Sequence, residues 1–321
     1  MSAVMEMDYA ACEQLKRKLV REYQGKTLAA VCGGQVIRTV AGECFGLEHR
    51  ETVSFQIGDP ETVAARLLSE VSLLSGVGEH KCQILKGQGH ESIESLLSHP
   101  RFGKNAGLFI ELIHRRDVRS LVGLIVRRPG FSHSHPLVFG TSSFCQQERL
   151  LFLDIETMGL SFEPIVLIGI AAVEGGEVVV RQYLARTFAE EGALLTALQR
   201  HLEPSEAIVS FNGRSFDVPY IRTRANALGI ACDLAKTHFD TYRLAKRAWG
   251  DRLPRHDLGT VEQHVLGVER SDDLPSWAVP EYYDAYRRTG SIGPLVPIIE
   301  HNRQDIISVV RLFNALHQTW C

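Results

Sequence analysis

Long apolar runs are absent from this sequence. No window approaches the roughly 18 consecutive apolar residues that a membrane-spanning helix needs. Residues 1–24 also lack the apolar core flanked by positive charge that marks a signal peptide. We therefore expect a soluble globular protein that is cytoplasmic and has no membrane partner.

Patterned cysteines and strong net charge are missing as well. The 7 cysteines include no Cys-x-x-Cys pair, and an odd, scattered set favours reduced thiols over a disulfide framework or a zinc site. The net charge is only −3 at pH 7, with the acidic excess in the second half. Such a half is unusual for a protein that meets phosphates, although bound divalent metals would offset part of its charge.

The composition changes between Pro129 and Gln147, where prolines, glycines and serines gather. We predict that residues 1–146 form a smaller N-terminal α+β domain of unknown role plus a linker, and that residues 147–321 form a second domain. In the first, short β-rich runs between glycines predict an antiparallel element over residues 27–56, with Leu28–Cys32 as one strand. An apolar stripe predicts a single helix from Asn105 to Val126.

Three arginines, Arg115, Arg116 and Arg119, lie opposite that apolar stripe. A basic helix face of this kind can contact a nucleic-acid backbone. The interspersed acids Glu111 and Asp117 favour an ordinary solvated face equally well. Both interpretations stay open at this point.

The second half alternates strands and helices. Three strands joined by turns are expected between Arg149 and Leu184, followed by helix, strand, helix and strand, and a last helix from Pro294 to about His317. This order predicts an α/β domain with one mixed sheet flanked by helices.

The first candidate functional residues are Asp154 and Glu156, two acids at the end of an apolar run. Residues i and i+2 of a strand point to the same side, so the two carboxylates should lie close together and repel unless a cation separates them. Hard divalent cations such as Mg²⁺ take oxygen ligands. The alternative is a strand end with two solvated acids.

Two later segments also carry acids beside apolar residues. Asp217 is expected at the start of a helix after a buried strand, where an acid can also serve simply as a helix cap. His301 and Asp305 lie four residues apart on the last helix and share one face. Buried His and Asp side chains need partners, and carboxylates bridged by a metal would supply them.

The three motifs in this order resemble the DEDD (DnaQ-like) superfamily of 3′–5′ exonucleases, which has a ribonuclease H-like fold. Phe-Leu-Asp-Ile-Glu-Thr-x-Gly-Leu at 152–160, Phe-Asp-x-Pro at 216–219 and His-Asn-x-x-Asp at 301–305 are most similar in style to YprB-like ribonuclease H-like proteins. The resemblance covers about residues 148–321, and residues 96–124 resemble the leader region of that group.

The resemblance implies that four acids hold two divalent ions, Mg²⁺ or Mn²⁺. Asp154 would bridge the two ions, Glu156 and Asp305 would bind the ion on the nucleophile side, and Asp217 would lie nearer the ion on the leaving-group side. Two such ions suit phosphodiester hydrolysis, because one activates a water and the other stabilises the departing 3′-oxyanion.

His301 departs from the superfamily pattern. The superfamily has a His five residues before the last acid or a Tyr four residues before it, whereas this chain has a His at the Tyr spacing. The offset corresponds to roughly 100° of helix rotation. We favour a catalytic role in orienting or deprotonating the attacking water; the alternative is a hydrogen bond to Asp305 or to substrate alone.

Further residues follow from the resemblance or from their neighbourhood. The expected substrate contacts are Thr157, Gly159, Leu160, Asn212 and Arg214. Asp240 and Glu262 lie outside the motifs and are interpreted as surface or capping acids. The sequence thus predicts a metal-dependent 3′–5′ exonuclease on single-stranded DNA or RNA. The alternatives are an RNase H-like endonuclease and a catalytically impaired nucleic-acid-binding or scaffold protein.

Overall fold

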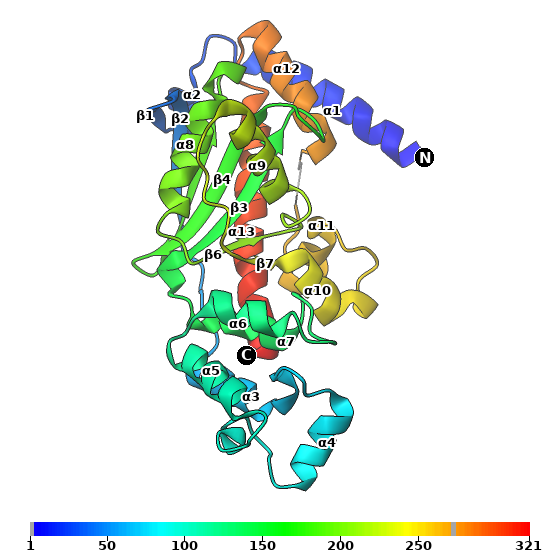
Figure 1. Cartoon of the computed structure of the whole chain (residues 1–321). Coiled ribbons are helices and arrows are strands. Elements are labelled where there is room, and N and C mark those ends of the chain that lie inside the picture. The colour runs from blue at the N-terminus through cyan, green and yellow to red at the C-terminus, as the bar shows by residue number, and fades with distance from the viewer. Residues whose placement is uncertain (1–2, 271–273) are drawn as a thin grey trace.

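The protein is described here by a computed structural model that covers residues 3–270 and 274–321. Its strands are β1 (Gln35–Thr39), β2 (Gly42–Glu51), β3 (Leu150–Thr157), β4 (Ile165–Glu174), β5 (Glu177–Leu184), β6 (Ala207–Ser210) and β7 (Thr237–Asp240). They form one 7-stranded sheet in the order β1-β2-β5-β4-β3-β6-β7 (Figure 1). Only the β3–β6 and β6–β7 pairs are parallel, which makes the sheet mixed.

Helices surround this sheet. Those of the first half are α1 (Ala3–Glu22), α2 (Leu28–Cys32), α3 (Pro60–Ser69), α4 (Glu79–Gly87), α5 (Gly103–His114), α6 (Val118–Ile125) and α7 (Pro136–Gly140). Those of the second half are α8 (Glu191–Leu202), α9 (Asp217–Leu228), α10 (Thr241–Trp249), α11 (Leu258–Val261), α12 (Val279–Thr289) and α13 (Leu295–Trp320). The expected architecture, a mixed sheet flanked by helices, is confirmed.

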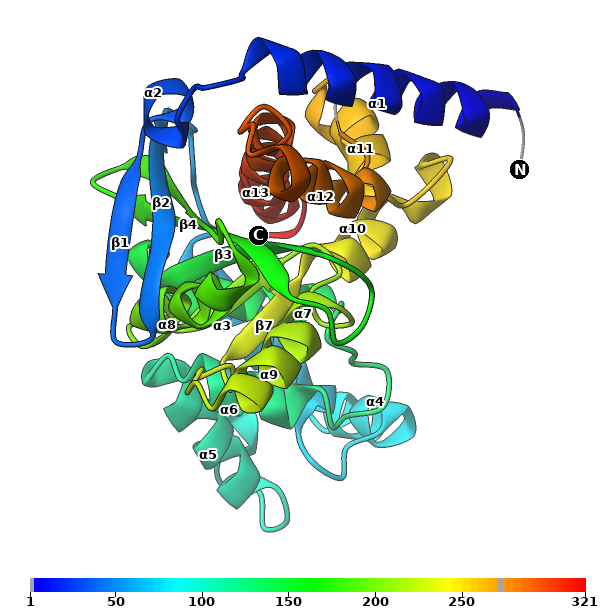
Figure 2. The same cartoon turned by 90° about the horizontal axis from the view of Figure 1, so that it is seen from above.

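Strand β3 lies inside the sheet and separates two apolar cores. Leu151, Leu153 and Ile155 pack with residues of α8 and α9. Phe152 points the other way and stacks edge-on against Phe313 of α13, with 5.7 Å between the ring centroids. Figure 2 shows α8 and α9 on one side of the sheet and α12 and α13 on the other. The side chains of β3 that alternate with the first set therefore face α13.

Strands β1 and β2 belong to the same sheet as β3–β7. Strand β2 pairs antiparallel with β5 from Phe45 opposite Leu184 to Glu51 opposite Val178. A sequence boundary near residue 147 therefore leaves strands of one sheet on both sides, and the division into two domains there remains a prediction. The strand expected at 28–32 is wrong, because α2 forms there with Thr27 as its N-terminal cap.

The single helix expected over 105–126 is also wrong. Helix α5 ends at His114, and Arg116 adopts a left-handed backbone with φ 53° before α6 begins. Asp117 then caps α6 by accepting a hydrogen bond from the Ser120 backbone N–H. The two helices pack against each other instead of forming one rod.

The expected basic helix face is divided by this break. Arg115 forms an ion pair with Glu111 and Arg116 forms one with Glu61, all four side chains being exposed. Two of the three arginines thus already pair with surface acids, as the solvated-face interpretation requires.

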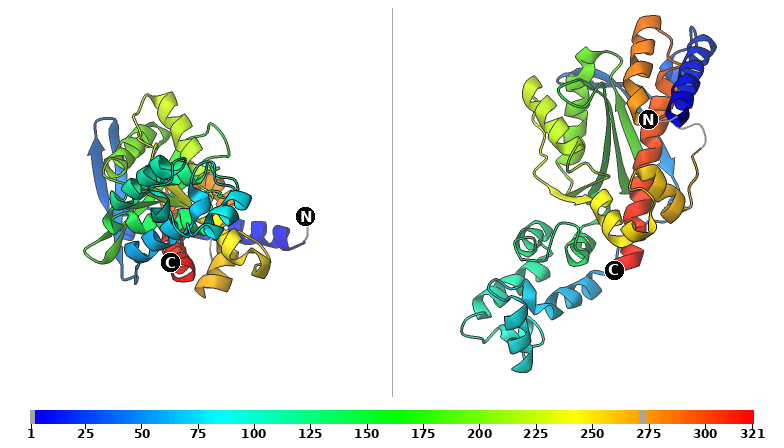
Figure 3. Two further views of the ribbon diagram at one scale, coloured as in Figure 1. Left: turned by 60° about the horizontal axis from the view of Figure 1, so that its bottom comes forward. Right: turned by 90° about the vertical axis from the view of Figure 1, so that its right-hand side faces the viewer.

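Helices α3–α7 pack at one end of the sheet, and α13 reaches them. Figure 3 shows α13 running along the sheet toward this helical region. Near its C-terminus, His317 accepts a hydrogen bond from the Gly58 backbone N–H at Nδ1, and its Nε2 lies 3.0 Å from Ser142 Oγ. Residues of α3, α6 and α13 share one apolar core, so the helical region is not a separate layer.

Within the described residues, no helix is both long and apolar enough to span a bilayer. Across the same part of the chain, the cysteines are all free thiols. The sequence also predicts a proline-rich excursion at residues 271–280, of which residues 271–273 lie outside the described part of the chain.

Candidate active site

Strand β3 supplies the first two acids. Asp154 lies opposite Gly169 of β4, and Glu156 lies opposite Leu167. Both side chains are on the α13 face of β3, because they alternate with the residues buried against α8 and α9. The strand register shifts between Glu156 and Thr157, which ends the regular pairing just beyond the second acid.

Asp217 supplies the third acid at the first residue of α9. It is 4% exposed and accepts hydrogen bonds from its own backbone N–H and from that of Ile155. Strand β6 pairs with β3 only as far as Phe152, so the Ile155 N–H has no strand partner there. Asp217 fills that place and is thereby held beside the end of β3.

The turn before α9 is held by another acid, Asp240. Its carboxylate accepts hydrogen bonds from the backbone N–H groups of Asn212 (2.9 Å) and Arg214 (3.2 Å), besides capping α10 through Tyr242. Asp240 is 4% exposed, so the surface interpretation is wrong and the capping one is confirmed. Between these residues, a Cβ on Gly213 would lie 2.3 Å from Ser210 Oγ, so only glycine fits.

Helix α13 supplies His301 and Asp305. The His301 side chain is buried, and its Nε2 lies 3.7 Å from Asp305 Oδ2, 4.0 Å from Glu156 Oε1 and 3.2 Å from Ser276 Oγ. The sequence left open whether a histidine four residues before Asp305 faces the site. In the structure its ring points toward acids of the site. The i, i+4 arrangement on one helix face is observed as expected.

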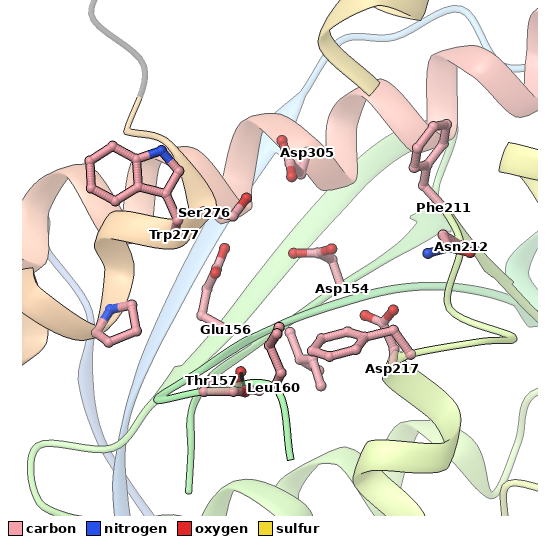
Figure 4. A pocket seen from close by; sticks show the side chains of 14 residues that line it. Asp154, Glu156, Thr157, Leu160, Phe211, Asn212, Asp217, Ser276, Trp277 and Asp305 are labelled. Atoms are coloured by element: carbon pink, nitrogen blue, oxygen red, sulfur yellow. Dashed lines mark hydrogen bonds between the residues drawn. The ribbon is translucent and has the colours of Figure 1, made fainter. Parts of the chain in front are cut away.

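The four acids line one hollow of about 530 Å³. In Figure 4 the carboxylates of Asp154, Glu156 and Asp305 point toward one another, with Asp217 on the other side of Asp154. Four carboxylates from strand β3 and helices α9 and α13 thus share one space.

The electrostatics of the hollow disfavour four bare negative charges. Burial raises the pKa of Asp154 well above its usual range, and the other three acids raise it further. Burial also raises the pKa of Asp217 to about 7, against the opposing effect of its two backbone hydrogen bonds. A positive charge in the hollow would relieve both effects.

Asn302, which the sequence did not single out, orients Asp154. Its Nδ2 donates to Asp154 Oδ2 at 2.7 Å, and its Oδ1 accepts from Gln182 Nε2 at 2.8 Å. Both amide side chains are fully buried. A Cβ on Gly169 would lie 2.1 Å from Asn302 Oδ1, so the glycine opposite Asp154 makes room for this amide.

Asp305 has a cationic neighbour, Arg270, which the sequence also missed. Arg270 Nη2 lies 2.5 Å from Asp305 Oδ1 and 2.5 Å from Glu262 Oε1. Glu262 is fully buried and also accepts a hydrogen bond from Ser308. The surface or capping interpretation of Glu262 is therefore wrong. The sequence gave no signal for this role, because Glu262 lies far from the motifs along the chain. A π-helical turn (Glu262–Leu266) brings it next to α13.

The donor chemistry of the hollow fits a hard divalent cation. All four acids offer carboxylate oxygens, the ligands that Mg²⁺ and Mn²⁺ prefer. One oxygen of Asp154 is taken by Asn302 and one of Asp305 by Arg270. In the described part of the chain, no group of three or more His, Cys, Asp or Glu side chains is already drawn together as a metal cage.

The expected substrate contacts divide into two groups. Four of them line the hollow: Thr157, Gly159, Leu160 and Asn212. Arg214 is not among its lining residues; its guanidinium lies 3.4 Å from the His238 carbonyl. Burial lowers the pKa of Arg214.

The mixed sheet, with acids on its inner strand β3 and on the helix α13 packed against it, defines a ribonuclease H-like protein. The chain belongs to the RNase_H superfamily, whose family model matches residues 151–317, just over half of its length. This assignment points to a nuclease.

Individual relatives are similar to parts of this chain. The chain is 28% identical over 260 residues to YprB, an uncharacterized protein of Bacillus subtilis (strain 168), covering 74% of this chain and 61% of YprB. It is 29% identical over 152 residues to a DNA polymerase of Pyrococcus horikoshii, covering 43% of this chain and 12% of that one. The chain thus spans less than two thirds of the length of either relative.

A solved structure is similar as well. The family B DNA polymerase of the archaeon Pyrobaculum calidifontis matches 51% of this chain and 24% of its own, at 19% identity and a TM-score of 0.39.

Proposed function

We propose that this protein is a metal-dependent nuclease that hydrolyses phosphodiester bonds, acting as a 3′–5′ exonuclease on single-stranded DNA or RNA. The observation that carries the proposal is the set of four carboxylates, Asp154, Glu156, Asp217 and Asp305, lining one hollow. At these four positions the sequence resembles the DEDD motifs. The cytoplasmic location remains a prediction.

These four residues would hold Mg²⁺ or Mn²⁺, two ions in the DEDD scheme. Bound divalent ions supply an activated water and stabilise negative charge on the leaving oxygen. The chain's own part is to fix the carboxylates: Asn302 holds Asp154, and the Ile155 N–H holds Asp217. A preorganised acidic cluster needs little rearrangement at the moment of reaction.

His301 is the proposed acid–base residue. Its Nε2 lies within 4.0 Å of both Glu156 and Asp305, so a water held between these acids lies within reach of the ring. A neutral imidazole nitrogen can accept the proton of that water, which is the part a general base plays.

The proposal is tested with 5′-labelled single-stranded DNA and RNA incubated with Mg²⁺ or Mn²⁺. We expect a ladder that shortens from the 3′ end and is abolished by Asp154→Ala. Asp233→Ala, at an exposed acid outside the hollow, is the matched control and should cut like the wild type. Internal cuts on a circular single strand would replace the exonuclease by an endonuclease.

One observation favours the second candidate, a binding or scaffold protein that no longer turns over. Arg270 already pairs with Asp305, and an arginine at this place supplies positive charge without a metal. Binding of single strands with no hydrolysis under either metal would support this candidate and contradict the nuclease.

A further inference from the structure

A tight turn joins the short 3₁₀ helix Val71–Leu73 to α4 and exposes its backbone to solvent. Val77 in the turn is 1% exposed and anchors it in an apolar core. Gly76 and Gly78 on either side of Val77 are exposed. Gly76 has a left-handed backbone with φ 84°, and a Cβ on Gly78 would meet nothing within 4 Å beyond its chain neighbours. The turn is therefore fixed by its buried side chain and open on its solvent side.

Two cationic side chains bond to the carbonyl groups of this turn. Lys81 Nζ donates to the Gly76 carbonyl at 3.0 Å. Arg128 Nη2 donates to the Val77 carbonyl at 3.2 Å. Lys81 comes from α4 and Arg128 from the segment after α6, so two distant parts of the helical region place their charges beside the same exposed backbone.

A third cation, Arg101, reaches the turn through an aromatic ring. Its guanidinium carbon lies 5.5 Å from the centroid of the Phe102 ring. That ring is buried beside the turn, since a Cβ on Gly76 would lie 3.8 Å from Phe102 Cε1. Arg101 itself is exposed. Three cations thus gather around one turn, and we call Lys81, Arg101 and Arg128 the cation cluster.

The charge of the cation cluster is not balanced by neighbouring acids. Within the described residues, none of the three cations forms an ion pair with a carboxylate, unlike the arginines between α5 and α6. In the same part of the chain, Arg128 Nε is buried without a hydrogen-bond partner. Glu79, the acid in the first turn of α4, is outnumbered by the cations. The turn therefore carries a net positive charge that can attract an anion.

This turn lies apart from the acidic hollow. Figure 1 shows α4 at the lower end of the molecule, with α6 and α7 between it and the sheet. None of the residues of the turn or of the cation cluster is among those that line the hollow. Any ligand of the cluster is therefore bound at a second place on the protein.

The surface around the cluster suits the outside of a double helix better than unpaired bases. Proteins that bind single strands stack the bases on aromatic side chains. Among the described residues 59–130, the large apolar side chains that are exposed are all aliphatic: Ile84, Leu97 and Leu108. A duplex instead presents its phosphates outward, and Lys, Arg and exposed backbone N–H groups bind them without reading sequence.

The chemistry of the cluster favours DNA over RNA. Lysine and arginine side chains only donate hydrogen bonds. Proteins that bind double-stranded RNA also contact ribose 2′-hydroxyl groups across the minor groove. Lys81, Arg101 and Arg128 offer no acceptor to such a hydroxyl, whereas phosphate oxygens accept from all three.

We propose that the cation cluster at the turn before α4 binds the phosphate backbone of double-stranded DNA, without sequence preference. The proposal goes beyond the proposed nuclease function and does not depend on it. It gives the helical region a role, which is to hold a duplex at a place separate from the acidic hollow.

The first test removes charge from the cluster and measures binding by the full-length protein in EDTA. The probe is a 5′-fluorescein blunt-ended DNA duplex of mixed sequence, read by anisotropy over a range of salt concentrations. Lys81→Ala/Arg101→Ala, at two exposed side chains, should lower the slope of log affinity against log salt by about 2. This corresponds to a loss of roughly 60-fold in affinity at about 0.1 M salt.

Arg17→Ala/Lys18→Ala is the matched control, because it removes the same charge from exposed positions of α1, at the other end of the molecule (Figure 1). Its affinity and salt slope should equal those of the wild type. An equal loss in this control, or an unchanged slope in Lys81→Ala/Arg101→Ala, would overturn the proposal.

The second test adds a negative charge without disturbing the fold. Gly78 is the N-terminal cap residue of α4, with φ −94° and open space around it, and Asp and Asn are equally good caps. Both Gly78→Asp and Gly78→Asn should therefore melt no lower than the wild type. Gly78→Asp should bind the duplex about tenfold or more weakly because it repels phosphate, and Gly78→Asn should largely retain binding. Equal binding by the two variants would contradict a phosphate contact at the turn.

Competitors identify the partner. Unlabelled duplex DNA should displace the probe at lower concentration than a single strand or an RNA duplex of the same sequence. A single strand or an RNA duplex that competes equally well would overturn the assignment to double-stranded DNA. Since binding is measured without metal, a wild type that binds the duplex through the cluster but degrades no nucleic acid would remove the nuclease and leave this site standing.

Discussion

Asn302 is the residue on which the position of Asp154 depends. Asn302 lies on α13, and its amide links two strands: it accepts a hydrogen bond from Gln182 of β5 and donates one to Asp154 of β3. It can do so only because Gly169 leaves the space. An amide donates to Asp154 without adding a negative charge, whereas an acid at this place would repel it.

Replacing Asn302 by Leu should therefore weaken metal binding more than it unfolds the protein. We expect Mn²⁺ affinity, measured by calorimetry, to fall about tenfold or more. The free energy of unfolding should fall by about 1–3 kcal/mol, because one N–H of the Gln182 amide loses its acceptor while the other still donates to the Ile299 carbonyl. Gln304→Leu on the same helix is the control. Unchanged Mn²⁺ affinity in a folded Asn302→Leu protein would exclude the positioning role.

Asp217 predicts how the metal-free protein responds to pH. Its pKa is about 7 when folded and about 3.9 when unfolded, so the folded state binds more protons between these values. Stability therefore falls as pH rises from about 4 to 7. Urea unfolding in EDTA should show this slope, and Asp217→Asn should reduce it. A slope that is the same in both proteins would contradict the assignment.

At the scale of elements, the sequence predicted the second half well. An apolar run predicted β3 and alternating apolar residues predicted β5. The shared position of the acids follows because strand and helix periodicities decide which residues lie on one face. Asn302, Asp240 and Glu262 escaped because their roles depend on partners far away in the sequence. No local pattern marks an amide on one helix that faces a glycine on a strand more than a hundred residues earlier.

The break between α5 and α6 shows a different limit. The apolar stripe continues through residues 105–126, so periodicity predicted one helix. The left-handed backbone of Arg116 and the N-terminal cap by Asp117 instead divide this stretch into two helices. Capping residues are visible in the sequence, but only tertiary packing tells whether a helix stops at one of them.

His317 of α13 links the sheet to the helical region through its hydrogen bonds to Gly58 and Ser142, and we expect this link to depend on pH. Burial lowers the His317 pKa to about 3, so the folded state binds fewer protons than the unfolded state below about pH 6.5. Stability from this group is lost as pH falls from about 6.5 to 3. His317→Leu should unfold more easily at neutral pH, by about 1–3 kcal/mol in chemical denaturation, and depend less on pH in this window.

His114→Leu, at an exposed histidine of α5, provides the comparison for that experiment. Its stability should follow the wild-type curve at every pH. Equal stability of His317→Leu and the wild type would show that Gly58 and Ser142 find other partners.

For the whole molecule, the shared sheet makes the second half dependent on the first. Strand β2 pairs with the edge of β5. In addition, the Tyr282 hydroxyl of α12 donates a hydrogen bond to the Cys12 carbonyl of α1. We expect a fragment of residues 147–321 to expose the β5 edge and aggregate, because an open apolar edge pairs with other chains. Size-exclusion chromatography of the fragment and of the full chain checks this; a stable monomeric fragment would contradict it.

The order of synthesis gives the sheet a further consequence. A ribosome makes β1 and β2 first, β3 about a hundred residues later, and α13 last of these elements. The synthesis of Asp154 therefore precedes that of Asp305 by roughly 150 residues of translation, which takes several seconds or more at ordinary elongation rates. Until then the nascent chain carries only part of its acidic cluster, so the proposed metal site would be complete only once α13 has been made.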